Sequence, residues 1–215
     1  IVIAGALQLY VVNLRATADN LRLSRLNHEL RATINLLHDD LRRAGYWSFT
    51  PDRALPTDNP FHNTANRLRI GQDAGEADAS CVLYSYDVNG DGRVGVGAIG
   101  GGPMTNAVNL EQFGFRLRNG QVQMRNGGNG FDCRSGNWQA VTDPDTEVTQ
   151  LRFTLTQTCS NLDDLEHACA AGDPALVRQH VGIVIAARNR SDQRVFQQLD
   201  STVAIANDLL LAAHP

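Results

Sequence analysis

The chain has 215 residues, 42% of them hydrophobic, which is enough for one long helix and one domain with a sizeable core. Its formal net charge of −4 argues against a nucleic-acid-binding surface, because such surfaces are usually basic. All 19 basic residues are arginines, so the sequence excludes P-loop NTPases, kinases, Schiff-base enzymes and other mechanisms that need a lysine ammonium.

Residues 1–46 are expected to form one long helix. Residues 1–14 carry no charge and are apolar on nearly every side, whereas residues 15–46 are amphipathic. No proline interrupts the segment, and Gly45 stands where a left-handed cap would end it. We expect the helix to pack on a folded domain through an apolar stripe that consists of Leu21, Leu26, Leu30, Ile34, Leu37 and Leu41.

The uncharged start of this helix is too short for a complete membrane span. It covers roughly 21 Å, whereas a bilayer core requires about 20 helical residues. It passes directly into the amphipathic part without a signal-peptide cleavage site, which favours an anchor helix over a signal-peptide remnant or a buried core helix. The chain starts at Ile1 without a basic leader, so we expect that residues are missing at its N-terminus.

Residues 47–215 are expected to form a globular antiparallel β domain. Segments with a period of two alternate with loops rich in glycine, proline and asparagine, and Asn119-Gly120 is a strong hairpin signal. One helix followed by antiparallel strands and long irregular loops makes an α+β fold. The predicted strands are residues 67–70, 81–86, 109–118, 121–125, 138–141, 147–156, 180–188 and 194–207.

The four cysteines allow three sets of disulfides, and none has the CxxC spacing of a zinc or redox site. Cys159 and Cys169 flank a short polar loop, whereas Cys81 begins a predicted strand and Cys133 closes a glycine-rich loop. We therefore favour the pairs Cys81–Cys133 and Cys159–Cys169, which are typical of an oxidising compartment such as the periplasm. The alternative is four free thiols in a reducing compartment.

Residues 87–93 (DVNGDGR) reproduce the first half of an EF-hand calcium loop, with oxygen ligands at alternate positions and glycine at the sixth. Position 12 is Ala98 instead of a bidentate glutamate, so a calcium site would need another carboxylate, from Glu111 or Asp132. The alternative is a tight turn whose aspartates cap their own backbone. The predicted ligands are the side chains of Asp87, Asn89 and Asp91 and the main-chain carbonyl of Arg93.

No other motif supports catalysis. The six histidines show no metal-ligand spacing, and no GxSxG nucleophile motif occurs. The acidic cluster of Asp163, Asp164 and Glu166 is more typical of a solvated surface than of an active site. We therefore predict that the protein is not an enzyme and that calcium is its only candidate cofactor.

Three segments resemble the PilW-type minor pilins of type IV pili. They are residues 5–10 (GALQLY), residues 40–47 (DLRRAGYW) at the helix end, and residues 84–92 (YSYDVNGDG). The resemblance implies a pilin-like fold, with a long N-terminal helix packed on an antiparallel sheet. The family's basic leader, its peptidase cleavage site and its N-terminal glutamate would all lie upstream of Ile1.

This resemblance implies a structural subunit that helps to initiate pilus assembly and sits near the pilus tip. Its partners would be other minor pilins, the major pilin and a PilY-type tip adhesin, with a role in twitching motility or adhesion. The protein would be anchored in the inner membrane with a periplasmic domain, and would lie in the extracellular pilus after assembly. The alternatives are a minor pseudopilin of a type II secretion system and a membrane-anchored, calcium-dependent adhesin. A mere anchor needs no amphipathic extension, which favours the filament subunit.

Overall fold

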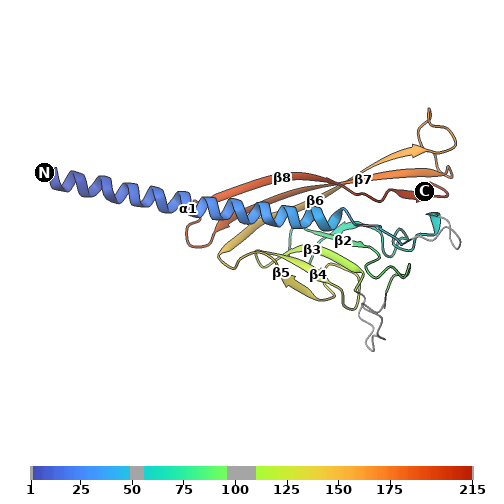
Figure 1. Ribbon diagram of the computed structural model, residues 1–215, viewed down its shortest axis with the longest axis horizontal. Helices are drawn as coiled ribbons and strands as arrows, with labels where there is room; N and C mark the ends of the chain where they lie inside the picture. The colour runs from blue at the N-terminus through green and yellow to red at the C-terminus, as the bar shows by residue number, and fades with distance from the viewer. Residues whose placement is uncertain (1, 49–55, 96–109, 215) are drawn as a thin grey trace.

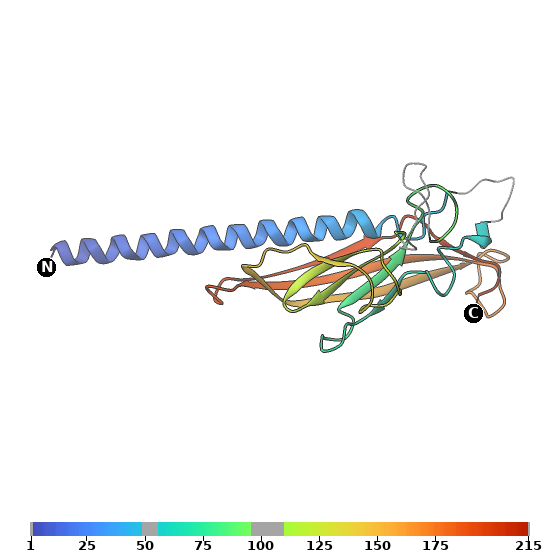
Figure 2. The same cartoon turned by 90° about the horizontal axis from the view of Figure 1, so that it is seen from below.

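The computed structural model describes residues 2–48, 56–95 and 110–214, which form one long helix and two antiparallel sheets (Figure 1). Helix α1 (Val2–Leu41) packs on the β domain through its C-terminal half, and its N-terminal half projects away from the domain (Figures 1 and 2). This is the α+β, pilin-like architecture that the sequence predicts.

The sheets follow one another along the chain, and each is antiparallel throughout. The single turn of 3-10 helix η1 (Pro56–Asp58) precedes the first strand. The first sheet has the order β1-β2-β3-β4-β5, with β1 (Arg69–Gly71), β2 (Cys81–Ser85), β3 (Gln112–Arg118), β4 (Gln121–Asn126) and β5 (Trp138–Ala140). The second sheet has the order β6-β7-β8, with β6 (Thr146–Asn161), β7 (Ala175–Asn189), β8 (Phe196–Ala204), and β9 (Leu209–Leu211) paired to β7.

The helix stripe is buried except at its first residue. Leu30, Leu37 and Leu41 have no exposed surface, and Leu26 and Ile34 are also buried. Leu21 was predicted to belong to this stripe, but that prediction is wrong, because 60% of the side chain is exposed. The step of five residues from Leu21 to Leu26 turns the side chain by about 140° around the helix, away from the domain.

Helix α1 ends at Leu41, earlier than the predicted helical segment of residues 1–46. Residues 42–45 form turns, in which the Arg42 N–H donates to the His38 carbonyl at 3.1 Å. Gly45 then has a φ of 75°, the left-handed conformation expected of a residue that ends a helix. The sequence therefore predicted correctly that the helical segment ends at Gly45, but residues 42–45 form turns and not regular α-helix.

The two longest strands extend further than predicted. Strand β6 continues to Asn161 and β7 begins at Ala175, so Cys159 lies within a strand and not at the start of a loop. Residues 156–158 of β6 are exposed on both faces, so the segment lacks the alternation that identifies a half-buried strand. Strand β9 was not predicted, and residue 109 of a predicted strand lies outside the described residues.

Two disulfides join the pairs that the sequence favours, Cys81–Cys133 and Cys159–Cys169. The first joins β2 to the glycine-rich loop 127–136, and the second joins β6 to the polar loop that follows it. Among the described residues, no helix is both long enough and apolar enough to span a membrane.

Candidate functional site

The end of α1 and the start of the candidate calcium loop lie together, although they are about 40 residues apart in sequence. The Gly45 N–H donates to the Ser85 carbonyl at 2.8 Å, and the Asp87 N–H donates to the Tyr46 carbonyl at 2.9 Å. A side chain at Gly45 would place its Cβ 2.2 Å from the His62 Nε2. Two of the segments that carry the family resemblance are thus joined by backbone hydrogen bonds.

A buried carboxylate strengthens this junction. Asp40, in the last turn of α1, accepts hydrogen bonds from the hydroxyls of Tyr84 and Tyr86, the latter at 2.8 Å. Burial, followed by the negative charge of Asp40, raises the pKa of both tyrosine hydroxyls, which keeps them protonated as donors. The Arg43 guanidinium lies 5.6 Å from the centroid of the Tyr86 ring and 3.9 Å from the Asp40 carboxylate.

The candidate calcium loop caps its own backbone. The Asp87 carboxylate is buried and accepts the N–H groups of Ser48 at 3.1 Å, Gly90 at 2.7 Å and Gly92 at 3.0 Å. Asn89 accepts the N–H of Asp91 through its side-chain oxygen at 2.9 Å. This is the tight-turn arrangement that the sequence offered as an alternative to calcium.

The same loop also gathers the oxygen ligands that calcium would need. Asp87, Asp91 and Glu111 each offer a carboxylate oxygen, and these oxygens lie within 4.8 Å of one another. Glu111 is buried and accepts the N–H groups of Val88 at 3.3 Å and Gly95 at 3.0 Å. Burial, assisted by the neighbouring aspartates, raises the pKa of Glu111, and a divalent cation here would offset that cost.

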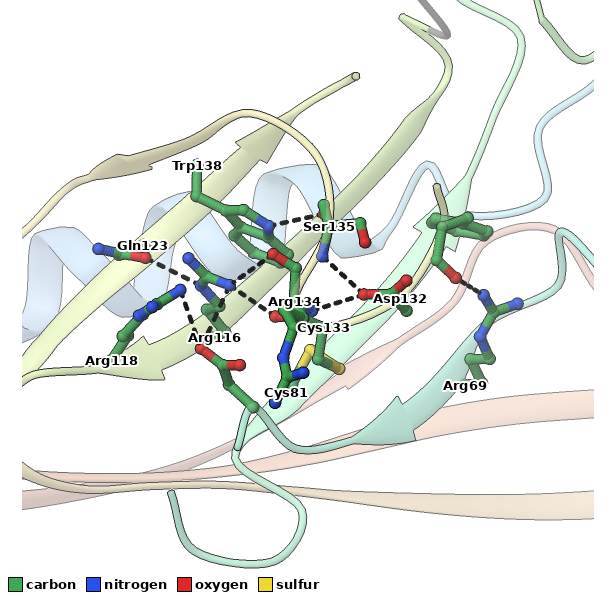
Figure 3. Close-up of a disulfide and its surroundings, with 12 residues drawn as sticks. Arg69, Cys81, Arg116, Arg118, Gln123, Asp132, Cys133, Arg134, Ser135 and Trp138 are labelled. Carbon is green, nitrogen blue, oxygen red and sulfur yellow. Dashed lines mark hydrogen bonds and ion pairs between the residues drawn. A yellow bond between two sulfur atoms is a disulfide. The ribbon is translucent and has the colours of Figure 1, made fainter. Parts of the chain in front are cut away.

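Of the two extra carboxylates that the sequence suggested, only Glu111 lies at this loop. Asp132 instead accepts the N–H groups of Arg134 at 2.7 Å and Ser135 at 2.6 Å, beside the Cys81–Cys133 disulfide (Figure 3). The donor set of Asp87, Asp91 and Glu111 fits a hard cation such as calcium. Calcium binding stays a prediction, and Ala98 lies outside the described residues.

A second cluster, which the sequence analysis missed, surrounds the Cys81–Cys133 disulfide (Figure 3). The buried Arg116 guanidinium donates to the Cys133 carbonyl at 2.6 Å, lies 4.2 Å from the centroid of the Trp138 ring and pairs with Asp73 at 3.3 Å. The Arg125 side chain is fully buried and donates to the carbonyls of loop 127–136. These arginines hold the glycine-rich loop on the sheet.

The positions of these arginines explain why sequence analysis missed them. In β3, Phe113, Phe115 and Leu117 alternate with Arg116, so Arg116 is predicted to face solvent. Loop 127–136 folds back over that face and buries it. No local sequence pattern predicts that this loop packs on β3. Only the predicted Cys81–Cys133 disulfide indicated that the loop lies near the sheet.

Comparison with models of protein families identifies the family to which the chain belongs. A family model described as prepilin peptidase-dependent protein B matches residues 19–205, which is most of the chain. The chain belongs to this family. It is therefore a pilin-like protein, related to type IV pilins and pseudopilins, and this family is structural. The match includes β7 and β8, well beyond the segments that carry the resemblance. No curated protein and no solved structure gives a significant match.

Proposed function

We propose that this protein is a PilW-type minor pilin, a structural subunit that helps to initiate type IV pilus assembly near the pilus tip. The observation that carries the proposal is the projecting half of α1, which has apolar side chains without a partner in the β domain. Tyr10, Val12 and Leu21 are each about 60% exposed. A helix of this kind is stable only when lipid or other helices surround it.

The shape of the molecule supports a defined orientation. The N-terminus of α1 lies at one end and the C-terminus lies near the opposite end, beside the tip of the β6–β7 hairpin (Figures 1 and 2). With α1 in the inner membrane, the β domain would lie in the periplasm, and after assembly it would lie in the extracellular pilus. Two disulfides suit both of these oxidising compartments.

The proposed partners are other minor pilins, the major pilin and a PilY-type tip adhesin. The exposed apolar side chains of α1 would pack against neighbouring helices, while the β domain would contact neighbouring β domains. Neither contact requires turnover of a substrate. The main alternative is a minor pseudopilin of a type II secretion system, since the family description names prepilin peptidase and neither a pilus nor a secretion system.

Calcium at the loop of Asp87, Asp91 and Glu111 is a separate proposal. It is supported by the convergence of three carboxylate oxygens within 4.8 Å. Such an ion would fix the loop to which the helix end is bonded, because Ser48 and Gly92 both donate to Asp87. A calcium-dependent binding module would use the same ion, so calcium alone does not separate the two functions.

Deletion of the protein in its parent organism tests the function. We expect loss of surface pili, restored by the wild-type chain and not by the double variant Val12→Gln, Leu14→Gln. These two exposed positions lie in the N-terminal half of α1, so the β domain should fold unchanged. The matched control is Asn13→Gln, which introduces the same residue at a neighbouring position that is already polar. Normal piliation in the deletion strain, together with a defect in protein secretion, would contradict the minor-pilin function and support the pseudopilin function.

A further inference from the structure

Strand β8 (Phe196–Ala204) forms a long border of the second sheet, on the side away from β6 (Figure 1). The other borders in the described residues are shorter or are already bonded along part of their length. Strands β1, β5 and β9 have three residues each. On the edge of β6, the Val148 N–H donates to the Gly120 carbonyl and the Phe153 N–H donates to the Ala79 carbonyl.

Two hydrogen bonds show which backbone groups of β8 point outward. The Asn189 N–H donates to the Val195 carbonyl, and the Ile205 N–H donates to the Gln179 carbonyl, each at 3.0 Å. Bonded and non-bonded residues alternate in an antiparallel pair, and the β7–β8 pairing has no register shift. The odd-numbered residues of β8 therefore bond to β7. The outward N–H and C=O groups belong to Phe196, Gln198, Asp200, Thr202 and Ala204.

This edge lacks the sequence features that usually protect an exposed strand. Natural edges are blunted by proline, lysine, bulges or inward-pointing charges, or are covered by a helix or loop. Helix α1 packs beside β8, and the side chains of residues 198, 200, 202 and 204 stay exposed. The sequence of β8 is FQQLDSTVA, whose one charged residue, Asp200, has an exposed side chain. Within the described residues, the N–H groups of Gln198, Asp200 and Thr202 have no hydrogen-bond acceptor. A row of such groups fits one kind of occupant, another extended strand.

Helix α1 flanks this edge with two surface hollows. One is lined by Leu23 of α1 and Phe196 of β8, among others, and the second by Ile34 and Asn35 of α1 and Leu199 of β8. An added strand would therefore find space for the side chains on its α1-facing side. The hollow at Leu23 and Phe196 precedes the hollow at Ile34 and Leu199 in both α1 and β8. The helix and the strand therefore run in the same direction.

We propose that β8 binds an extended segment of a neighbouring pilin-like subunit, which adds to the second sheet beside α1. The inference rests on the proposed function, because it takes the neighbour from the assembled filament. A two-fold pair of identical chains joined at β8 would point their α1 helices in opposite directions. Subunits anchored in one membrane have aligned helices, so the added segment comes from a neighbour without that two-fold relation.

A substitution at Asp200 tests the backbone contact. The Asp200 N–H points outward and does not bond to β7, so Asp200→Pro removes an outward donor without breaking a bond within the sheet. Asp200→Thr is the matched control, because it changes the same side chain and keeps the N–H. Each full-length variant is expressed in the deletion strain with a photo-crosslinking residue at Gln198 or at Thr202.

We expect the two crosslinking positions to attach to one segment of one pilin-like protein, at sites about four residues apart. Asp200→Thr should retain these crosslinks, and Asp200→Pro should reduce them at least tenfold while the protein stays resistant to proteolysis. Crosslinks that are scattered over several segments, or that persist in Asp200→Pro, would overturn the inference. If Asp200→Pro does not fold, Gln198→Pro with crosslinking at Thr202 makes the same test.

Piliation separates failure of this inference from failure of the proposed function. If the deletion abolishes pili, and the chain that keeps Asp200 restores them with no crosslinked segment at Gln198 or Thr202, the minor-pilin function stands and the β8 contact is absent. If the deletion leaves piliation unchanged and no pilin-like protein is crosslinked, the proposed function and this inference both fail.

Discussion

At the scale of single residues, burial separates side chains that look equivalent in the sequence. Leu21 and Leu37 are both leucines of the amphipathic half of α1. Leu37 has no exposed surface and contributes to the main hydrophobic core, whereas Leu21 is 60% exposed. Such a difference decides how much each side chain contributes to folding.

We expect Leu37→Ala to reduce the free energy of unfolding by about 2–5 kcal/mol, because it leaves a cavity in the core. Leu21→Ala should change it by less than about 0.5 kcal/mol, as is typical of surface positions. Denaturant unfolding of both variants measures the difference. Equal costs at the two positions would contradict the packing of α1 described above.

His62 gives the protein a pH-dependent stability. Burial beside Gly45 lowers the pKa of this histidine from 6.5 to about 4, and the Asn59 amide lies 3.3 Å from its Nδ1. The unfolded chain therefore binds a proton more readily than the folded one. The stabilisation is complete above about pH 6.5 and is lost as the pH falls toward about 4.

We expect the free energy of unfolding to fall by about 1–3 kcal/mol between pH 7 and pH 4.5 through this group. Denaturant unfolding at several pH values measures it. His62→Gln keeps a side chain of similar size without titration, and its curve should be flatter over that range. Identical curves for the two proteins would assign the pH dependence to other groups.

At the scale of elements, the end of α1 is held by hydrogen bonds to β2 and to the loop after it. Asp40 accepts from Tyr84 and Tyr86, and Gly45 donates to Ser85. The two tyrosine hydroxyls donate to the buried Asp40 carboxylate and so offset part of the cost of burying it. The sequence DLRRAGYW and the sequence YSYD thus form one structural unit, of which the loop 87–93 is a continuation.

We expect millimolar calcium to raise the melting temperature of the protein through this loop. A ligand present at about 100 times its dissociation constant stabilises a folded protein by about 2.7 kcal/mol. Asp91→Asn should abolish the shift, since it removes a charged ligand and keeps the oxygen that accepts the Arg93 N–H at 2.8 Å. Scanning calorimetry with magnesium as the control ion measures this. An unchanged melting temperature would contradict calcium binding and favour a tight turn that is stabilised by its own hydrogen bonds alone.

At the scale of the whole molecule, the helix divides into a supported and an unsupported half. From Leu26 to Leu41 the stripe is buried, whereas Tyr10, Val12 and Leu14 are exposed. An isolated helix in water is marginally stable, so the unsupported half of α1 is expected to open more readily than the β domain.

In detergent-free solution, limited trypsin treatment should cut first after the exposed Arg15, in the unsupported half of α1. The resulting fragment should retain the melting temperature of the intact chain within about 2 °C, because residues 10 and 12–15 are exposed. Mass spectrometry identifies the cut. Arg15→Gln should delay it, and first cleavage within the β domain would show that the helix is not the weak point.

Much of the fold could be predicted from the sequence, because it depends on local patterns. The steps of three and four from Leu26 to Leu41 determine the buried face of α1, and Gly45 determines where the helical segment ends. Asn119 and Gly120 both have positive φ values, of 52° and 72°, as their hairpin turn requires. The sequence DVNGDG likewise determines the tight turn at Asp87.

The tertiary structure alone decided which distant groups meet. Glu111 joins Asp87 and Asp91 because β2 and β3 pair in one register, and Arg116 is buried because loop 127–136 returns over β3. The position of β8 at a free border also depends on the order of strands in the sheet and not on its own sequence. Local patterns record the conformation of a segment and the side it buries. Contacts between segments depend on how the whole chain closes around its core, so they appear only once that chain is folded.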